Sequence, residues 1–267
     1  MTNGGEPPLQ RPFVSFYSQL ATEAPHMSKK AVLVIGAGDA TGGAIARRFA
    51  REGYAAVIVR RDADNLTDLA SQIRAEGGEA HPFGVDARLE EPMVELFDRV
   101  EAEIGPLEVV VFNIGANVNF GVRDTTARVY RKVWEMAAFA GFLTGREAAR
   151  HMVPRGRGTI IFTGATASLR GGKGFSAFAG AKFALRALAQ SLARELGPEG
   201  VHVAHTIIDG AIDTEWIATN FPQRHALKDR DGILNPDHIA DAYWMLHQQP
   251  RDAWTHELDL RPWMETF

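Results

Sequence analysis

A cluster of small residues follows the first strongly apolar run of the chain. Ile35 is succeeded by Gly36-Ala37-Gly38-Asp39-Ala40-Thr41-Gly42-Gly43. Glycines let a backbone approach a phosphate closely, and the helix that follows offers free N–H groups and the positive end of its dipole. The spacing differs from the common G-x-G-x-x-G because Thr41 stands where the last glycine would fall. A plain turn is the alternative, but the position between a buried strand and a helix favours a nucleotide site.

Two adjacent arginines, Arg60 and Arg61, follow the second apolar run. Folds that bind NAD carry an acid at about this distance from the glycines, because a carboxylate binds the ribose hydroxyls. A guanidinium group instead binds the 2′-phosphate that distinguishes NADP. The pair therefore predicts NADP(H) in preference to NAD(H), with a solvated pair of surface arginines as the alternative.

Apolar runs and amphipathic stretches alternate along the chain. The strands and helices that they predict carry the glycine cluster and the arginine pair. The alternation predicts one α/β domain, a single doubly wound parallel sheet of Rossmann type with helices on both faces. Ligands of such sheets bind beyond the carboxyl ends of the strands. The expected strands are Ala31–Ile35, Ala55–Val59, one that contains Val85, Val109–Asn113, Gly158–Phe162 and Val201–Ile208. The expected helices are Gly42–Glu52, Asp64–Ala75, Glu90–Glu103, Thr125–Met152 and Phe178–Leu196.

Composition narrows the class of protein. The 267 residues are 45% hydrophobic, contain no cysteine and carry a formal net charge of −4. Such a balance predicts neither nucleic acid nor a membrane as partner, and the missing cysteines fit a reducing, cytoplasmic compartment. Residues 1–30, rich in glycine and proline, are expected to form a flexible arm with a short helix at Phe13–Leu20, and residues 31–267 the domain. His202 and His205 would point to opposite faces of one strand, so no metal site is expected.

Five motifs of one protein family occur in order between Ala31 and the C-terminus, and the chain resembles short-chain dehydrogenases/reductases (SDRs) of the classical type. The family's T-G-x-x-x-G-x-G motif corresponds to Ile35–Gly42, with Ala40 in place of the middle glycine. Its aspartate that contacts adenine corresponds to Asp86, which Ala87 follows.

Two further motifs extend the resemblance. The family's N-N-A-G corresponds in part to Asn113-Ile114-Gly115-Ala116. Its P-G-x-x-x-T segment, which touches the nicotinamide carboxamide, corresponds to residues 209–214, with Asp209 in place of proline. The resemblance, taken with the arginine pair, implies that NADP(H) is bound by Gly36, Gly38, Asp39, Ala40, Thr41, Gly42, Arg60, Arg61, Asp86, Ala87, Asn113, Gly115, Lys182, Gly210, Ile212 and Thr214.

The fifth motif, Tyr-x-x-x-Lys, departs from the family. Phe178 occupies the position of the tyrosine that donates a proton to the substrate oxygen, while Lys182 is retained. Ala165, thirteen residues before Phe178, occupies the position of the serine that polarises the carbonyl. The family's asparagine on the preceding helix corresponds to the apolar stretch Met136-Ala137-Ala138.

Lys182 and several hydroxyl groups remain for the missing chemistry. Phe178 and Lys182 lie four residues apart and share one helical face, so Lys182 is expected to hold the ribose hydroxyls; a solvent-facing lysine is the alternative. Tyrosines occur only at positions 17, 54, 130 and 243 and are not expected near the site. Hydroxyl groups are expected beside it, at Thr163, Thr166, Ser168 and Ser176. The expected catalytic residues are Lys182, Thr166 and Phe178, although capping of the loop is the favoured role for the hydroxyls.

Three functions remain open from the sequence. The first is an NADPH-dependent oxidoreductase that reduces an apolar or aromatic carbonyl, enone or imine-like substrate. The second is an inactive NADP-binding regulatory or interaction protein, and the third is a non-redox lyase or isomerase that uses the same pocket. A substrate lid is expected around 215–235, and the long helices are expected to assemble a homodimer or homotetramer. An apolar or aromatic small molecule is expected from Phe175, Phe178, Trp216, Ile217 and Phe221.

Overall fold

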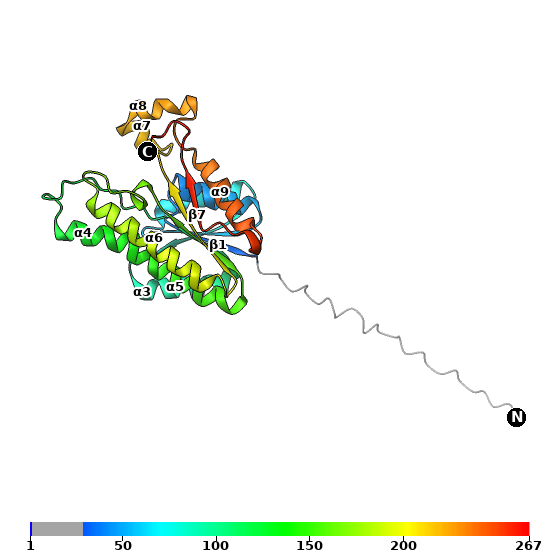
Figure 1. Cartoon of the computed structure of the whole chain (residues 1–267). Helices are drawn as coiled ribbons and strands as arrows, with labels where there is room; N and C mark the ends of the chain where they lie inside the picture. Colours follow the sequence, from blue (N-terminus) through cyan, green and yellow to red (C-terminus); the bar gives the residue numbers. More distant parts are fainter. Residues whose placement is uncertain (2–28, 267) are drawn as a thin grey trace.

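A computed structural model describes Met1 and residues 29–266, so the predicted N-terminal arm and its helix at Phe13–Leu20 lie almost wholly outside the described part. Within that part, seven parallel strands form one sheet in the order β3-β2-β1-β4-β5-β6-β7. The strand order reverses between β1 and β4, which is the switch point of a doubly wound sheet. The predicted fold class is confirmed (Figure 1).

The strands differ from the expected ones mainly at the two edges. β3 ends at Gly84, so Val85 lies just after the strand; its N–H still donates to the Arg60 carbonyl at 2.8 Å. β7 was not expected, because it is only four residues long and alternates acidic residues with leucines. The strands are β1 Ala31–Ile35, β2 Ala55–Arg60, β3 Glu79–Gly84, β4 Leu107–Phe112, β5 Gly158–Thr163, β6 Val201–Ile208 and β7 Glu257–Leu260.

The helices cover both faces of the sheet. Helices α3, α4, α5 and α6 lie on one side in Figure 1 and α9 on the other, where α1 packs against it. They are α1 Thr41–Arg51, α2 Thr67–Ala75, α3 Glu90–Arg99, α4 Ala127–Trp134, α5 Ala140–Met152, α6 Ser176–Leu196, α7 Glu215–Asn220, α8 Pro222–His225 and α9 Pro236–Gln248. Short 3-10 turns lie between several of them, one of which precedes α2 at Asp64–Leu66.

The expected long helix at Thr125–Met152 is two α-helices joined by a π-helical turn. The turn is Glu135–Phe139, between α4 and α5. It includes the residues that correspond to the SDR asparagine, of which Ala137 and Ala138 are buried. Such turns shift a helix face and are often found near functional sites.

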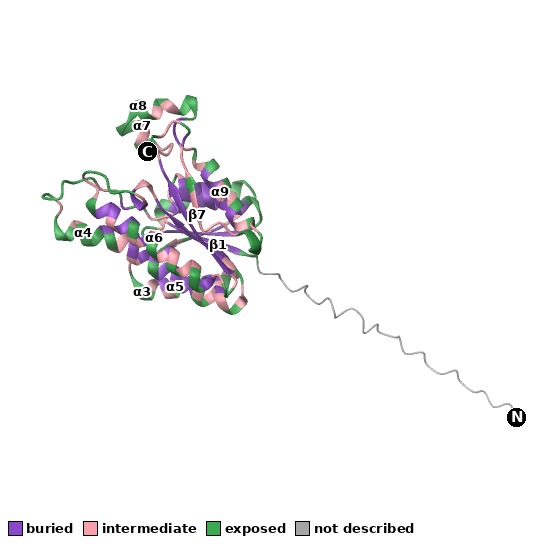
Figure 2. Ribbon diagram, viewed as in Figure 1, coloured by how far each residue is buried: buried purple, intermediate pink, exposed green. Residues whose placement is uncertain are grey.

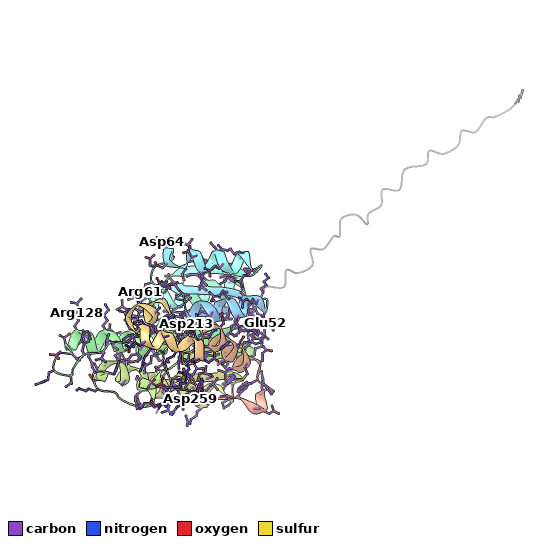
Figure 3. The ribbon with its side chains drawn as sticks, turned by 90° about the horizontal axis from the view of Figure 1, so that it is seen from above. Glu52, Arg61, Asp64, Arg128, Asp213 and Asp259 are labelled. Atoms are coloured by element: carbon purple, nitrogen blue, oxygen red, sulfur yellow. The ribbon has the colours of Figure 1, made fainter. Side chains whose placement is uncertain are left out.

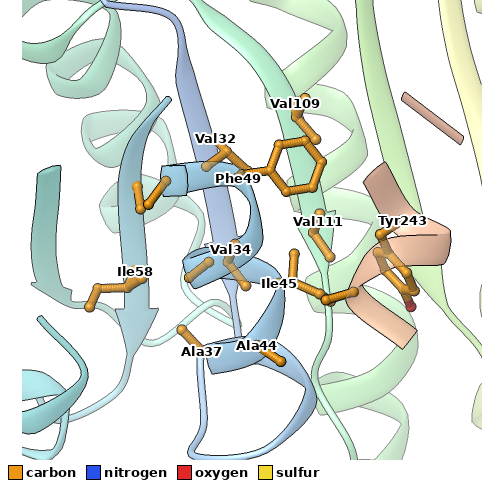
Figure 4. Packing of buried hydrophobic residues seen from close by; sticks show 14 of the residues in the cluster. Val32, Val34, Ala37, Ala44, Ile45, Phe49, Ile58, Val109, Val111 and Tyr243 are labelled. Atoms are coloured by element: carbon orange, nitrogen blue, oxygen red, sulfur yellow. The ribbon is translucent and has the colours of Figure 1, made fainter. Parts of the chain in front are cut away.

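Alternate strand residues supply two separate cores. Val32 and Val34 pack with α1, α2 and α9, whereas Leu33 and Ile35 pack with α3, α5 and α6. Figure 4 shows the first core, with Phe49 and Tyr243 against the sheet, and Figure 2 shows the sheet buried between its helices. Burial on both faces is why these strands read as continuous apolar runs.

Candidate active site

The glycine turn between β1 and α1 can hold a pyrophosphate. Gly36 has a φ of +90°, which disfavours any residue with a side chain, and a Cβ at Gly42 would lie 2.3 Å from the Gly36 carbonyl oxygen. No atom lies within 4 Å of the Cβ positions of Gly38 and Gly115, so space remains open there. Ala40 precedes α1 and supplies no side-chain cap, so the helix N-terminus keeps N–H groups for an anion.

The arginine pair divides into one constrained and one exposed side chain. Arg60 Nη1 lies 3.6 Å from Asp39 Oδ1 in the glycine turn and donates to the Asn65 carbonyl at 3.2 Å. Arg61 is exposed after the end of β2 and is labelled in Figure 3. Arg61 is therefore the more accessible cation for a phosphate at this strand end.

Asp86, expected to contact adenine, is bound by Arg88. The guanidinium donates from Nε to Oδ1 at 2.9 Å and from Nη2 to Oδ2 at 2.5 Å. These bonds hold the pKa of the Asp86 carboxyl below its usual value, although burial opposes them and the positive charge of Arg61 adds to them. Asp86 thus stays ionised and fixed. An adenine ring at this position would meet a carboxylate that already accepts hydrogen bonds from Arg88.

Asn113 ties two strand ends together. Its Nδ2 donates to the Gly36 carbonyl at 3.0 Å, and its backbone N–H donates to the Ile35 carbonyl at 2.8 Å. The side chain therefore braces the glycine turn from the end of β4. Gly115, two residues later, leaves open space beside that brace.

Lys182 is buried on α6, which rules out the solvent-facing alternative. Its side chain is 3% exposed, and Nζ donates to the carbonyls of Thr163 at 2.7 Å and Ile114 at 3.3 Å. Burial lowers the pKa of this ammonium to about 8. An ammonium has three N–H donors, so one is left for a ribose hydroxyl at the ends of β4 and β5.

An apolar cluster contains or contacts the residues that correspond in sequence to the SDR catalytic groups. Phe178 is buried, and its ring centroid lies 6.0 Å from Lys182 Nζ, which confirms that the two side chains share one face of α6. Ala165 and Met136 pack against the same cluster, so all three substituted positions meet. Its buried members are Ala116, Val133, Ala137, Ala167, Ala177, Phe178, Ala179 and Ala181.

Three of the four hydroxyl groups expected near this cluster, those of Thr163, Thr166 and Ser168, have hydrogen-bond partners. Thr166 donates to Asp209 Oδ1, and Ser168 Oγ accepts from the Ala165 N–H at 3.1 Å. The expectation that no tyrosine lies near the loop is wrong. The Tyr243 hydroxyl lies 2.8 Å from Thr163 Oγ1, although it reaches that threonine from α9 on the other face of the sheet.

A helical segment follows β6 where the lid was expected. Gly210 has a φ of +149°, Ile212 bridges to Leu234, and Thr214 caps α7 by accepting from the Ile217 N–H at 3.1 Å. Nothing in α7 is buried, and its Trp216 ring lies 5.4 Å from that of Phe221. This segment rises from the ends of the strands beside the C-terminus (Figure 1).

The buried acid Asp209 was missed as a functional candidate. The sequence showed it only as a substitution for proline, and the signal that was available is a carboxylate directly after the predicted strand Val201–Ile208. Among residues 29–266, no cluster of three acidic or histidine side chains is placed to hold a metal ion. In the same part of the chain, no helix is long and apolar enough to cross a bilayer.

Comparison with known proteins identifies the family to which the chain belongs. The family model described as short chain dehydrogenase matches residues 30–225, and the chain belongs to that family. It is 26% identical over 228 residues to gluconate 5-dehydrogenase of Gluconobacter oxydans (strain 621H), which covers 85% of this chain and 83% of that protein.

Solved structures agree with this class. A short-chain dehydrogenase from Rhodopseudomonas palustris is 49% identical, with a TM-score of 0.76 over 88% of this chain and 99% of that one. A metagenomic short-chain oxidoreductase in complex with NADP, 24% identical, shares the fold with a TM-score of 0.74 over 90% and 99% of the two chains. The protein is an NAD(P)-dependent oxidoreductase of the SDR type.

Proposed function

We propose that this protein transfers a hydride between NADP(H) and an apolar or aromatic small molecule, at a centre that lacks the SDR tyrosine, serine and asparagine. The oxidised substrate is a carbonyl compound, an enone or an imine; for a carbonyl compound, the reduced partner is the alcohol. One observation carries the proposal: the buried Lys182 ammonium joins the ends of β4 and β5 and keeps an N–H for a ribose. Burial of a lysine ammonium in a core costs free energy. A role in binding a cofactor accounts for this burial better than a purely structural role does.

The residues present fit a dinucleotide. The glycine turn and the start of α1 hold the pyrophosphate, Asn113 braces the turn, and Lys182 orients the ribose next to the nicotinamide. A bound nicotinamide supplies or accepts the hydride. The apolar cluster around Phe178 excludes water from the reacting carbon and supplies the surface for a hydrophobic substrate.

The preference for NADP(H) is assigned mainly to Arg61. Arg60 is held by Asp39 and by the Asn65 carbonyl, so its charge is partly neutralised. Arg61 is exposed and has its guanidinium available for a 2′-phosphate. We expect NADP(H) to bind at least about tenfold more tightly than NAD(H), a difference of ~1.4 kcal/mol.

Calorimetry with both cofactors tests the assignment. Arg61→Ala should remove most of the preference, Arg60→Ala less, and Arg194→Ala, which removes an exposed arginine from α6, should leave it unchanged. Equal affinities for NADPH and NADH in the wild type contradict the preference. Tight NADPH binding without oxidation or reduction of any member of a panel of ketones, enones, imines and alcohols contradicts the hydride transfer.

We also propose that the protein assembles with two-fold symmetry through α4, α5 and α6, in a reducing, cytoplasmic compartment. Aromatic side chains stand exposed on these helices. Trp134 stacks on Phe139 at 6.1 Å, and Phe139 stacks on Phe142 at 6.2 Å. A surface of this kind is typical of a contact between protein chains.

A further inference from the structure

A carboxylate lies buried at the carboxyl end of β6. Asp209 is 1% exposed, and its Oδ1 accepts the hydroxyl proton of Thr166. Arg170 Nη2 lies 3.5 Å from Oδ1 and 3.4 Å from Oδ2, and Arg261 Nη1 lies 3.7 Å from Oδ2. Burying a charge is costly without partners, and here the partners come from the loops after β5 and β7.

The hydrogen bond to Asp209 decides what Thr166 can offer to a ligand. A hydroxyl carries one proton and two lone pairs, whereas an ionised carboxylate only accepts. The proton of Thr166 is given to Asp209. Towards a ligand, therefore, Oγ1 presents lone pairs, and it accepts a hydrogen bond instead of donating one to a carbonyl.

Thr166 lies next to the position that corresponds to the SDR serine. It follows Ala165, which packs against the cluster that contains Phe178. Phe178 in turn lies on the face of α6 that carries Lys182. Thr166 is half-buried, so part of its surface remains open. Ala165 therefore stands at the position of the SDR serine, and the next residue, Thr166, offers a hydrogen-bond acceptor.

We propose that Thr166 and Asp209 form a proton-accepting pair, and that the substrate of this site is an apolar secondary alcohol, which the enzyme oxidises. The proposal rests on the proposed function, because oxidised NADP must accept the hydride. The substrate O–H proton passes to Thr166 Oγ1 while the proton of Thr166 passes to Asp209 Oδ1. The carbinol hydrogen leaves with its electron pair, and the carbon–oxygen double bond forms. The proton on Asp209 returns to water beside Arg170, whose side chain is 44% exposed.

Thr166 is the catalytic residue of the pair and Asp209 positions its proton. Binding of two inert probes tests this without turnover. The first, 1-methylcyclohexanol, donates a hydrogen bond and has no carbinol hydrogen to lose. The second, 2-methylcyclohexanone, has the same number of heavy atoms and only accepts. Their dissociation constants are measured by ligand-observed NMR on the full chain saturated with NADP⁺.

The wild type should bind the alcohol about fivefold or more tightly than the ketone, because an acceptor facing an acceptor leaves both without a partner. Thr166→Val should bring the ratio close to one, and Thr166→Ser should restore it. Asp209→Asn should reverse the ratio, because an amide N–H can donate to Oγ1 and free the threonine proton for the ketone. Ser191→Ala, which removes an exposed hydroxyl farther along α6, should leave the ratio unchanged.

Three results overturn the proposal while NADP⁺ still binds. They are a ketone bound as tightly as the alcohol, no binding of either probe, and an Asp209→Asn variant that weakens both probes equally, as a purely structural carboxylate would. Failure to bind NADP⁺ contradicts the proposed function instead. Thermal unfolding of each variant identifies any loss that is due to misfolding.

Discussion

Phe178 places an aromatic ring, without a hydroxyl, next to the Lys182 ammonium. The 6.0 Å distance between Nζ and the ring centroid is within the range of a cation–π contact, which is worth about 0.5–2 kcal/mol. Burial of Lys182 costs free energy, and the two carbonyls that accept from Nζ offset part of it. At the scale of single residues, the proposed site therefore retains an ammonium for a ribose, and a phenylalanine stands at the position that corresponds to the SDR proton donor.

Restoring the lost hydroxyls tests that division. Phe178→Tyr adds a phenol on the face of α6 that carries Lys182, and Ala165→Ser adds a donor in the adjacent loop. The double variant should gain turnover of simple ketones with NADPH by at least about tenfold, because a general acid contributes about 10²–10⁴. Phe178→Tyr alone should gain less, because the carbonyl stays unpolarised.

The same substitution has a second possible readout. Where Phe178 packs against the natural ligand, the added hydroxyl lacks a partner, and ligand binding should weaken by ~1–3 kcal/mol. Steady-state kinetics and ligand titration of the same variants separate the two effects. If neither turnover nor affinity changes, Phe178 does not face the cofactor.

At the scale of elements, a strand, a turn and a helix act as one unit at the glycine turn. Gly36 N–H donates to the Val59 carbonyl at 3.0 Å, and Gly43 N–H donates to the Gly38 carbonyl at 2.7 Å. The turn is thus tied to β2 and folded onto the start of α1. Asn113 holds it from β4, so three elements fix where a phosphate would sit.

Two glycines of this turn should respond differently to alanine. In Gly42→Ala the new Cβ would lie 2.3 Å from the Gly36 carbonyl oxygen, so the turn must open, and both stability and NADP(H) affinity should fall. In Gly38→Ala the Cβ enters open space, so stability should hold while affinity falls at least about tenfold as the methyl group occupies the cradle.

Thermal unfolding and calorimetry measure the two quantities, with Gly171→Ala as a control. That glycine also has open space around its Cβ position, but it lies in the loop before α6. Unchanged cofactor affinity in Gly38→Ala would place the pyrophosphate elsewhere.

At the scale of the whole molecule, buried histidines couple the fold to pH. Burial lowers the pKa values of His205 and His247 from 6.5 to about 4 each. His205 faces Glu257, Arg186 and Lys182, and His247 lies between the hydroxyls of Tyr54 and Thr159. Both rings are neutral in the native state at neutral pH.

Stability should therefore fall as the pH is lowered from 6.5 to 4. The unfolded chain binds protons on these rings near pH 6.5, whereas the folded chain does so only near pH 4, so the unfolded state is favoured in between. The loss is on the order of 2–3 kcal/mol for each ring. Urea unfolding at pH 7 and pH 4.5 measures it. His247→Gln should weaken the pH dependence, and His238→Gln, at an exposed position on α9, should not.

The exposed aromatic side chains on α4, α5 and α6 predict an oligomer. Tyr130, Trp134, Phe142 and Phe183 are 42–47% exposed. Light scattering should report at least twice the 29.2 kDa chain mass. Phe142→Asp should shift the protein towards the monomer, because the interface would bury an unpaired charge. Val122→Asp, in an exposed loop, should leave the assembly intact. A wild-type monomer at micromolar concentration contradicts the two-fold assembly.

The sequence by itself determined the class of fold and the strand ends at which ligands are expected to bind. β1 begins and ends where its apolar run does, because both of its faces are covered, whereas β6 is buried throughout although it carries His202, His205 and Thr206. The glycines, the arginine pair and Lys182 were found in the same way, because each has a local reason to stand at a strand end or on a helix face. β7 escaped prediction, because its alternation of polar and apolar residues extends over only four positions.

Only the tertiary structure decided which polar groups meet. Thr166 and Asp209 are 43 residues apart, and Thr163 and Tyr243 are 80 apart, so no spacing rule connects them. Arg60 and Asp39 likewise meet across two strand ends, which leaves Arg61 as the more available cation. Parallel strands bring their carboxyl ends together through long crossover connections, and hydrogen bonds between those ends depend on the three-dimensional register. That register determines whether a hydroxyl such as that of Thr166 donates its proton to a substrate or to a buried acid.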